Sequence, residues 1–477
     1  MSLLGLELSD AGIMVAAADP ARLLTVDGHG TESPGFALPE KKRLTVGSTA
    51  ERKAHLYPRQ IIDRFWDQLN TEPLEQPNPY AQNHAEIACE HLARIWKTVN
   101  DHGNELVITV PGFFNQNHMG LILGISRELS IPVKGFVAQA VASAPNALPE
   151  GLLLHLDIHL HRSEVTCLKR QDRLIQKDSL SLEGSGISRL YKDWVNTIAE
   201  EFVRSTRFDP LHQAASEQEL YNRLPIVLEQ LKHRPTVIFE MTGGSNTYHV
   251  NLTQELFLQK SEPVFREIGR LIDRMREQYE KNEPTVVLQL THRLTRLPGV
   301  NEALSEKDGC LVIELEPGTG ALGALQFRDQ LSSQPVGQGA PFLTSRPLPA
   351  ISQTHVSPPQ PQPKEKVRPT HLLYRDLAYP ITEQPLFIGL EAAVDASGIL
   401  IQGQIAGVSR KHCSVQLQEQ GVVLEDFSAY GTFVDADRVT GSAVLQLGQV
   451  IRVGTPGETL LLIACLDTDE TQKSNDI

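Results

Sequence analysis

The sequence predicts an α/β domain followed by an all-β sandwich. Over residues 1–327, short apolar runs alternate with amphipathic stretches, which is typical of strands interleaved with helices. Residues 328–370 are dense in Pro, Gln and Ser and show no apolar period, so we expect a linker there. Residues 371–468 hold short strand-like runs separated by Gly, Ser and Asp turns, as in a β-sandwich, and residues 469–477 form a polar tail.

The composition argues against several classes of protein. The formal net charge is -14, and no stripe of Lys and Arg is visible, so nucleic acid is not an expected partner. The five cysteines are scattered, which suggests neither a zinc ribbon nor a disulfide framework. No basic leader and no run of 18 or more apolar residues occurs, so we expect no direct membrane insertion. These features predict a cytoplasmic protein, and we expect it to be bacterial.

The alternation in the α/β block is clearest before residue 160. The runs "ELVITVPGFF" and "LLLHLDI" have the length and composition of buried strands. Between them lie "NHMGLILGISREL" and "VKGFVAQAVASA", which continue the alternation. Strands separated by helices of this length indicate an α/β architecture.

The stretch "LLLHLDIHLHRSEV" places His155, Asp157, His159 and His161 at every second position. On a pleated strand these four side chains would all point to one face. Two interpretations follow, a metal site or histidines packed in a closed cleft. Because a zinc site also needs convergent, deprotonated ligands and a supporting shell of partners, we expect no metal here.

Four segments carry a family resemblance over about residues 1–326. They are "LLGLELSDAGIMVA", "GSTAERKAHLYPRQIIDRFWDQL", "LVITVPGFFNQNHMGLILGISRELSIPVKGFVAQAVASA" and "VVLQLTHRLTRLPGVNEAL". Their order and spacing resemble the nucleotide-binding domain of seventy-kilodalton heat-shock chaperones, which belong to the actin-like ATPase superfamily. The resemblance implies a two-lobed, ribonuclease H-like α/β fold that binds ATP and magnesium between its lobes.

The nucleotide motifs of that family are altered here. The family strand ends in an Asp, matched by Asp157, but His159 and His161 stand where a glycine-rich turn would cradle phosphates. Glu7 brings a negative charge to the first phosphate loop. Arg293 stands in the place of a glycine that contacts the adenosine. If nucleotide binding is retained, the resemblance implies that Glu7, Asp157 and Arg293 contact the nucleotide.

The catalytic groups of the family are also missing. The lysine that orients the attacking water corresponds most nearly to Trp66, and the glutamate at the lobe hinge corresponds to Ala138. Without a phosphate cradle or a water-positioning group, nothing lowers the barrier to phosphoryl transfer. We therefore expect no catalytic residue, no enzymatic activity and no cofactor, with ATP and magnesium binding as the alternative.

Four motifs in the C-terminal block carry a second resemblance. "FIGLEAAVD", "VSRKHCSV", "EDFSAYGTFVD" and "LGQVIRVG" stand in the order and spacing of a forkhead-associated (FHA) domain over residues 371–468. The resemblance implies structural roles for Gly389 and His412. It also implies recognition of phosphothreonine by an Arg after the first Gly, by the Ser of the Ser-x-x-His element and by an Asn before the Gly-Thr pair.

Two of these three recognition groups are replaced. Ser409 is retained, but Leu390 stands in the Arg position and Tyr430 in the Asn position, so charge-assisted phosphate contacts are reduced. Arg410 is a candidate to supply the missing charge. The residues expected to contact a phosphopeptide or protein partner are Ser409, Arg410, Lys411, Tyr430, Gly431 and Thr432.

Together these features predict a non-catalytic scaffold or adaptor that pairs a degenerate actin-like domain with a degenerate FHA module. Its expected partners are proteins, with threonine phosphorylation of the partner left open. The first alternative is a phosphothreonine-dependent signalling adaptor, and the second is an ATP-binding, chaperone-like ATPase. A tether of about 40 residues would raise the effective concentration of each module near a shared partner.

Overall fold

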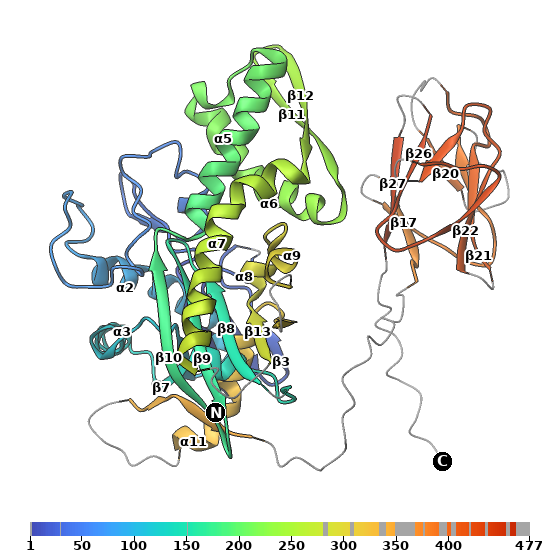
Figure 1. Cartoon of the computed structure of the whole chain (residues 1–477). Coiled ribbons are helices and arrows are strands. Elements are labelled where there is room, and N and C mark those ends of the chain that lie inside the picture. Colours follow the sequence, from blue (N-terminus) through green and yellow to red (C-terminus); the bar gives the residue numbers. More distant parts are fainter. Residues whose placement is uncertain are drawn as a thin grey trace, which may run out of the picture. The chain divides into compact units, whose positions relative to one another are not determined.

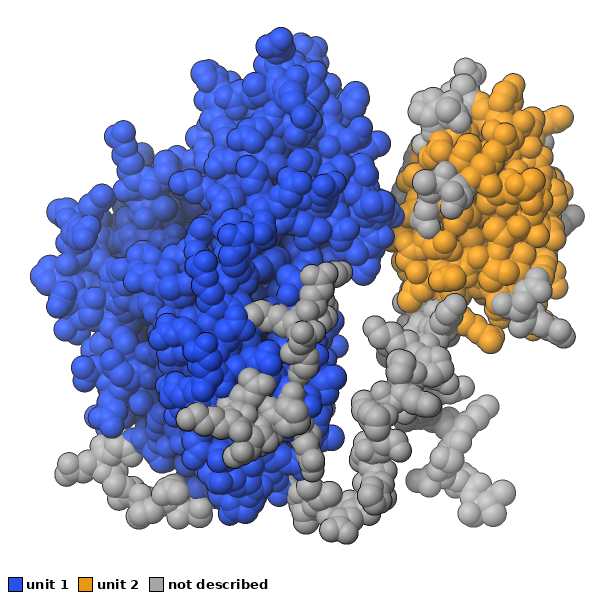
Figure 2. All heavy atoms as spheres, in the orientation of Figure 1, with its two compact units in different colours: residues 1–352 blue, residues 353–477 orange. Residues whose placement is uncertain are grey.

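The chain folds into two compact units, residues 1–352 and residues 353–477, which are coloured separately in Figure 2. The computed structural model describes residues 2–28, 30–149, 151–279, 285–305, 310–332, 340–348, 368–374, 377–390, 398–401, 407–418, 421–434, 437–454 and 458–463. The polar tail expected at residues 469–477 lies outside these ranges. No helix in the described part of the chain is both long and apolar enough to cross a membrane.

The N-terminal unit is a mixed α/β structure built on two six-stranded sheets (Figure 1). The first sheet has the order β15-β7-β6-β1-β2-β3. Its strands are β1 (Leu3–Glu7), β2 (Met14–Ala18), β3 (Ala21–Leu23), β6 (Glu105–Val110), β7 (Val133–Ala138) and β15 (Phe342–Leu343). Strands β1, β2 and β3 pair antiparallel, whereas β1, β6 and β7 pair parallel.

The second sheet has the order β14-β13-β8-β9-β10-β16, and its first five strands repeat the topology of β7-β6-β1-β2-β3 in the first. Its strands are β8 (Leu152–Ile158), β9 (Arg162–Arg170), β10 (Arg173–Glu183), β13 (Val286–Leu290), β14 (Cys310–Glu314) and β16 (Ser345–Pro347). Again the first three strands pair antiparallel, and β8, β13 and β14 pair parallel. Strands β1 and β8 occupy equivalent places and are buried along their whole length, so the polar ends of these strands lie inside the unit.

Helices and a hairpin complete the first half of this unit. They are β4 (Ala37–Pro39), β5 (Leu44–Val46), α1 (Ser48–Glu51), α2 (His84–Val99), η1 (Asn100–His102), α3 (Gln116–Glu128) and α4 (Gln139–Ser143). Helix α3 begins where the Asn115 side chain accepts the backbone N–H of His118, while His118 accepts the N–H of Asn115. This reciprocal cap satisfies two backbone donors, so the helix starts at a defined residue.

The second half carries a larger helical insertion. Its elements are α5 (Ile187–Thr206), η2 (Pro210–His212), α6 (Ala214–His233), β11 (Thr236–Gly243), β12 (Asn246–Thr253), α7 (Gln254–Tyr279), α8 (His292–Thr295), α9 (Val300–Ser305), α10 (Thr319–Ala324), η3 (Leu325–Phe327) and α11 (Arg328–Ser332). Helices α5 and α6 lie with the β11-β12 hairpin beyond the second sheet (Figure 1). Buried aromatic residues such as Trp194, Phe202 and Phe257 form part of one core with β8 and β13.

Part of the expected linker belongs to the N-terminal unit. Strands β15 and β16 are separated by one residue; β15 extends the first sheet beside β7, and β16 extends the second beside β10. Arg346 is buried on β16 and donates to the carbonyls of Ala144 and Pro145, both at 2.7 Å. Residues 340–348 therefore join the two sheets, while residues 349–367 of the expected linker lie outside the described residues.

The C-terminal unit is the all-β sandwich that the sequence predicts. Its sheets have the orders β18-β17-β27-β26-β23-β24 and β20-β19-β21-β22-β25. The strands are β17 (His371–Tyr374), β18 (Leu377–Pro380), β19 (Leu386–Gly389), β20 (Gly398–Leu400), β21 (Cys413–Gln418), β22 (Gly421–Asp426), β23 (Thr432–Val434), β24 (Asp437–Arg438), β25 (Ser442–Leu445), β26 (Val450–Val453) and β27 (Glu458–Ile463). Ile388, Val415 and Leu460 are fully buried between the sheets.

Candidate functional site

The first candidate site is a buried polar cluster in the N-terminal unit, centred on Arg293. The Nη2 atom of Arg293 donates to Glu7 Oε1 and to Asp157 Oδ2, both at 2.7 Å, and Nε donates to Asp157 Oδ1 at 3.0 Å. These three residues are 2–3% exposed. The structure thus brings together the three residues expected to contact a nucleotide, but their charged groups bind one another.

Neighbouring groups satisfy the remaining oxygens of this cluster. Glu7 Oε2 accepts the backbone N–H of Gly320 at 3.0 Å, in the first turn of α10. Asp157 accepts from Thr291 Oγ1 at 2.6 Å and from Gln139 Nε2 at 2.8 Å. Burial opposes ionisation of Asp157, but the charge and hydrogen bonds of Arg293 outweigh it and hold the pKa of Asp157 well below its ordinary value.

His159 is a second buried cation candidate beside this cluster. Its Nδ1 lies 3.0 Å from Ser9 Oγ, and its Nε2 lies 3.4 Å from Glu164 Oε2 and 3.9 Å from Asp157 Oδ2. Burial alone would lower the pKa of His159, but the charge of Asp157 and the nearby carboxylate of Glu164 raise it. The carboxylates of Asp157 and Glu164 therefore favour the protonated form of His159.

Strand β8 holds only the first two of the four alternating residues, His155 and Asp157, because His159 and His161 follow its end. Strand β8 ends at Ile158, and the chain turns where the N–H of His159 donates to the carbonyl of Arg162. His155 contacts Gln289, whereas His161 Nε2 lies 3.0 Å from the carbonyl oxygen of Asp63. Among the described residues, no group of three or more His, Cys, Asp or Glu side chains has the arrangement of a metal site.

Two residues that the heat-shock chaperone resemblance placed at catalytic positions lie in the core. Trp66 is buried and donates from Nε1 to His91 Nδ1 at 3.0 Å. Ala138 is buried at the end of β7. Neither side chain presents a charged group to the Arg293 cluster. Gln139 and Thr291 are partners of Asp157 that the sequence did not reveal, because no local pattern marks a contact across 18 or 134 residues.

An exposed edge of the same region is closed by ion pairs between distant segments. Glu32, in the segment after β3, lies 2.6 Å from His292 Nε2 and 2.7 Å from Arg296 Nη1. Burial would raise the pKa of Glu32, but the hydrogen bond to His292 and the charge of Arg296 lower it to about 2. A separate contact joins the loop after α1 to helix α6, where the rings of His55 and Tyr221 stack with 3.5 Å between their centroids.

The lowered pKa of Glu32 predicts a loss of stability in acid. The stabilising contribution of Glu32 should be complete above its ordinary pKa of 4.5 and should be lost as the pH falls from there towards 2. We expect urea unfolding to distinguish the wild-type protein from Glu32→Gln at pH 6, with the difference in stability narrowing as the pH falls from 4.5 towards 2. Tryptophan fluorescence reports on the N-terminal unit alone, because all three tryptophans precede residue 200. A gap independent of pH would contradict the assignment.

The second candidate site lies in the loops of the C-terminal unit, where His412 joins two loops. The imidazole is fully buried; Nδ1 accepts the backbone N–H of Ser409 at 3.0 Å, and Nε2 donates to the carbonyl of Gly431 at 3.2 Å. Ser409 Oγ accepts the N–H of Ala429 at 3.3 Å. His412 therefore holds the Ser409 loop against the Gly431 loop.

Gly389 permits the close contact between β19 and this loop. A Cβ atom at Gly389 would lie 2.0 Å from the carbonyl oxygen of Arg410, so only glycine fits there without a shift of the backbone. Leu390 is half-buried and packs against the sandwich core. The Arg position of the family therefore holds a side chain that contributes to packing.

Thr432 lies inside the sandwich and not on its surface. Its hydroxyl donates to Asp426 Oδ1 at 2.6 Å, and Asp426 also accepts the N–H of Ser428 at 3.0 Å. Ser428 Oγ in turn accepts the N–H of Gly431 at 2.8 Å. Thr432 therefore shapes the loop and is too buried to contact a partner. The sequence analysis did not identify Asp426 and Ser428, which support the loop. The local pattern Asp-x-Ser before Gly-Thr is the signal that could have revealed them.

The exposed rim of this site combines aromatic and cationic groups. Tyr430 is 68% exposed and Phe427 is 51% exposed. Arg410 and Lys411 are also exposed, and Lys411 Nζ lies 4.5 Å from the centroid of the Phe387 ring. Ser409, Arg410, Lys411 and Tyr430 thus gather in one loop cluster, joined through His412 and Ala429.

One family model matches part of the C-terminal unit. The FHA domain family matches residues 393–454, so the C-terminal unit contains an FHA domain, a class of module that binds phosphothreonine-containing proteins. No curated protein matches the chain. The N-terminal unit is a mixed α/β structure, and its resemblance to heat-shock chaperones remains a prediction.

Proposed function

We propose that this protein is an adaptor whose FHA domain binds a threonine-phosphorylated segment of a protein partner. The observation that carries the proposal is the arrangement around His412, which holds the Ser409 loop beside the Gly431 loop within a matched FHA domain. The family match favours this phosphothreonine-dependent function over the phosphate-independent scaffold that we expected from the sequence.

The phosphate chemistry proposed for this site differs from that of the family. Leu390 supplies no charge, so the cations must come from elsewhere on the rim. Arg410 and Lys411 follow Ser409 directly and are exposed, so their charges lie near the hydroxyl that would donate to a phosphate oxygen. Tyr430 offers an exposed aromatic ring and a hydroxyl where the family uses an amide to hold the peptide backbone. We infer a weaker contact with the peptide backbone and a larger apolar contribution.

The test is peptide binding to the full chain. Using a fluorescent phosphothreonine peptide library and its unphosphorylated counterpart, we expect binding only to the phosphorylated form. Ser409→Ala should weaken binding about tenfold, since a hydrogen bond to a charged group contributes about 1.5 kcal/mol. Ser442→Ala, an exposed serine on β25, is the matched control and should leave binding unchanged. Equal binding of both libraries would reject the phosphate-dependent function.

We further propose that the N-terminal unit is an actin-like domain without nucleotide turnover. The repeated topology of its two sheets supports the fold, and the mutual pairing of Glu7, Asp157 and Arg293 supports the lack of turnover. A triphosphate would have to displace two buried carboxylates from Arg293, and this exchange costs the pairing energy that now stabilises them. Calorimetry of the full chain with millimolar magnesium-ATP should give no binding heat. Saturable binding, or release of phosphate, would support the ATPase alternative.

A further inference from the structure

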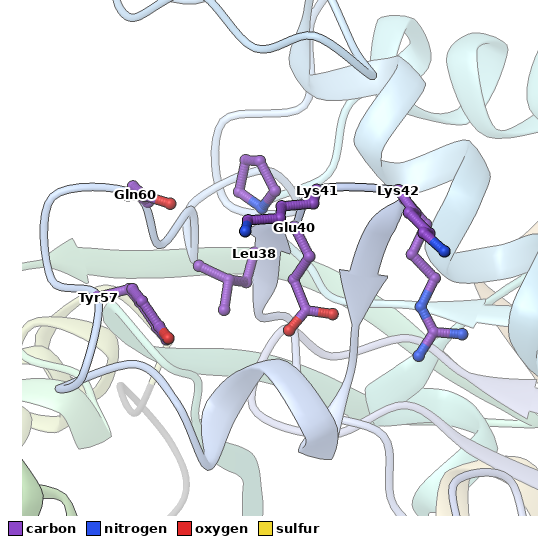
Figure 3. Close-up of a pocket in the computed structure, with 8 residues that line it drawn as sticks. Leu38, Glu40, Lys41, Lys42, Tyr57 and Gln60 are labelled. Atoms are coloured by element: carbon purple, nitrogen blue, oxygen red, sulfur yellow. The ribbon is translucent and has the colours of Figure 1, made fainter.

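A surface pocket of about 760 Å³ lies beside the β4-β5 hairpin of the N-terminal unit, apart from the Arg293 cluster (Figure 3). Leu38 and Glu40 come from the hairpin, whereas Tyr57 and Gln60 come from the loop that follows α1. Figure 3 shows these two segments on facing sides of the hollow. The pocket therefore has walls from two segments about 20 residues apart.

The tip of the hairpin gives this pocket a positive charge. Lys41, Lys42 and Arg43 are consecutive, line the pocket and are exposed. Among the described residues none of them forms an ion pair. Glu40, the acidic residue of the lining, is already engaged by Lys53 Nζ and by Thr45 Oγ1, both at 2.6 Å. The chain has a formal net charge of -14, so the positive charge at this hairpin is opposite to that of the protein as a whole.

The pocket also offers an apolar wall. Leu38 and Pro39 line it from the hairpin, and the Tyr57 ring, which is 47% exposed, lines it from the opposite loop. An exposed tyrosine supplies apolar contact area at a small cost in side-chain entropy. The combination of three cations, one amide and an aromatic ring suits a ligand that carries both negative charge and an apolar side chain.

Backbone hydrogen bonds hold both walls in place. The N–H of Glu40 donates to the carbonyl of Arg43 at 2.9 Å and closes the hairpin tip. Ala37 and Ile62 exchange two backbone hydrogen bonds, at 2.8 and 2.9 Å, and so tie the facing loop to β4. A site formed before binding loses less conformational entropy when a ligand enters.

We propose that this pocket docks an acidic peptide segment of a protein partner, one that carries an aromatic or aliphatic residue among its carboxylates. Carboxylates of the segment meet Lys41, Lys42 and Arg43 at the rim, and its apolar side chain packs against Tyr57. This contact is independent of phosphothreonine recognition, because every contributing residue lies in the N-terminal unit. Complementary charge of this kind mainly accelerates association and selects the partner.

The test uses the full chain and a fluorescein-labelled peptide of sequence Glu-Asp-Glu-Leu-Glu-Phe-Asp-Glu. We expect Lys41→Glu/Lys42→Glu/Arg43→Glu to weaken binding at least twentyfold. Tyr57→Ala should weaken it about fivefold, because an apolar contact is lost while the charge is kept. The matched control is Lys260→Glu/Arg270→Glu/Arg274→Glu, which changes the net charge equally on the exposed side of α7 and should change affinity less than twofold.

Three outcomes would overturn the proposal. Equal loss in the α7 control would show that only net charge matters. Unchanged affinity in Tyr57→Ala would show that the pocket wall takes no part. Equally tight binding of a 20-base-pair DNA duplex would show a general preference for polyanions. Loss of phosphopeptide binding by Ser409→Ala, measured on the same samples, reports on the FHA domain, so failure of one proposal is distinguishable from failure of the other.

Discussion

Arg293→Met is expected to destabilise the N-terminal unit by about 3–5 kcal/mol, because it removes one partner from a buried ionic cluster. Glu7 and Asp157 would face each other without the guanidinium that now bonds to both. The cost is large because both carboxylates are 2% exposed and water cannot replace the lost partner. Urea unfolding followed by tryptophan fluorescence measures this effect, since all three tryptophans lie in this unit.

Two further variants separate charge from packing at this site. Glu7→Gln/Asp157→Asn/Arg293→Met removes the whole ionic set and should recover most of the lost stability, because a buried ion pair is often replaceable by neutral groups. Arg293→Lys keeps the charge but loses the bidentate geometry and should fall between Arg293→Met and the wild type. A loss below about 1 kcal/mol in Arg293→Met would mean that solvent reaches the carboxylates. It would contradict the buried cluster.

His412→Ala is expected to destabilise the C-terminal unit by about 3 kcal/mol and to abolish phosphopeptide capture. The substitution leaves the N–H of Ser409 and the carbonyl of Gly431 without their partner and opens a cavity between two loops. Hydrogen exchange of residues 371–463, followed by mass spectrometry, should show faster exchange in both loops. Tryptophan fluorescence of the N-terminal unit should not change, which provides an internal control.

The pH dependence of this effect follows from the protonation of His412. Burial lowers the pKa of His412 from its ordinary value of 6.5, so its contribution is complete above that pH and is lost as the pH falls. Wild-type protein and His412→Ala should therefore converge in acid. His371→Ala, a partly exposed histidine on β17, is the matched control and should change exchange little. Equal effects of the two substitutions would contradict the structural role of His412.

Local motifs in the sequence identified the FHA domain, which the family match at residues 393–454 supports. The resemblance to FHA domains, carried by these motifs, implied roles for Gly389, Ser409 and His412, and the structure shows His412 bonded to both the Ser409 and Gly431 loops. Thr432 shows where this reasoning fails. Its place in the Gly-Thr pair suggested partner contact, but its hydroxyl points inward to Asp426. A motif gives the residue type, whereas burial decides which face of the loop it occupies.

The histidine stretch shows a related limit. Alternation predicts one face only while the strand continues, and the turn after Ile158 ends the strand before His159. The turn depends on backbone hydrogen bonds at residues 159–162, which the apolar pattern does not reveal. Strands β15 and β16 were not predicted either. They lie in a Pro-rich and Ser-rich segment that shows no alternation of apolar residues, although it pairs with the edges of both sheets.

By itself the sequence determined the order of an α/β block and a β-sandwich, and it identified the FHA motifs, because local spacing and hydrophobic pattern encode both. Only the tertiary structure decided that Arg293 would neutralise Glu7 and Asp157, which lie 286 and 136 residues away in sequence. Charges interact through distance and local dielectric, and both are properties of the packed chain. The Arg293 guanidinium could bind a phosphate or bind the two carboxylates, and packing places it close enough to do the latter.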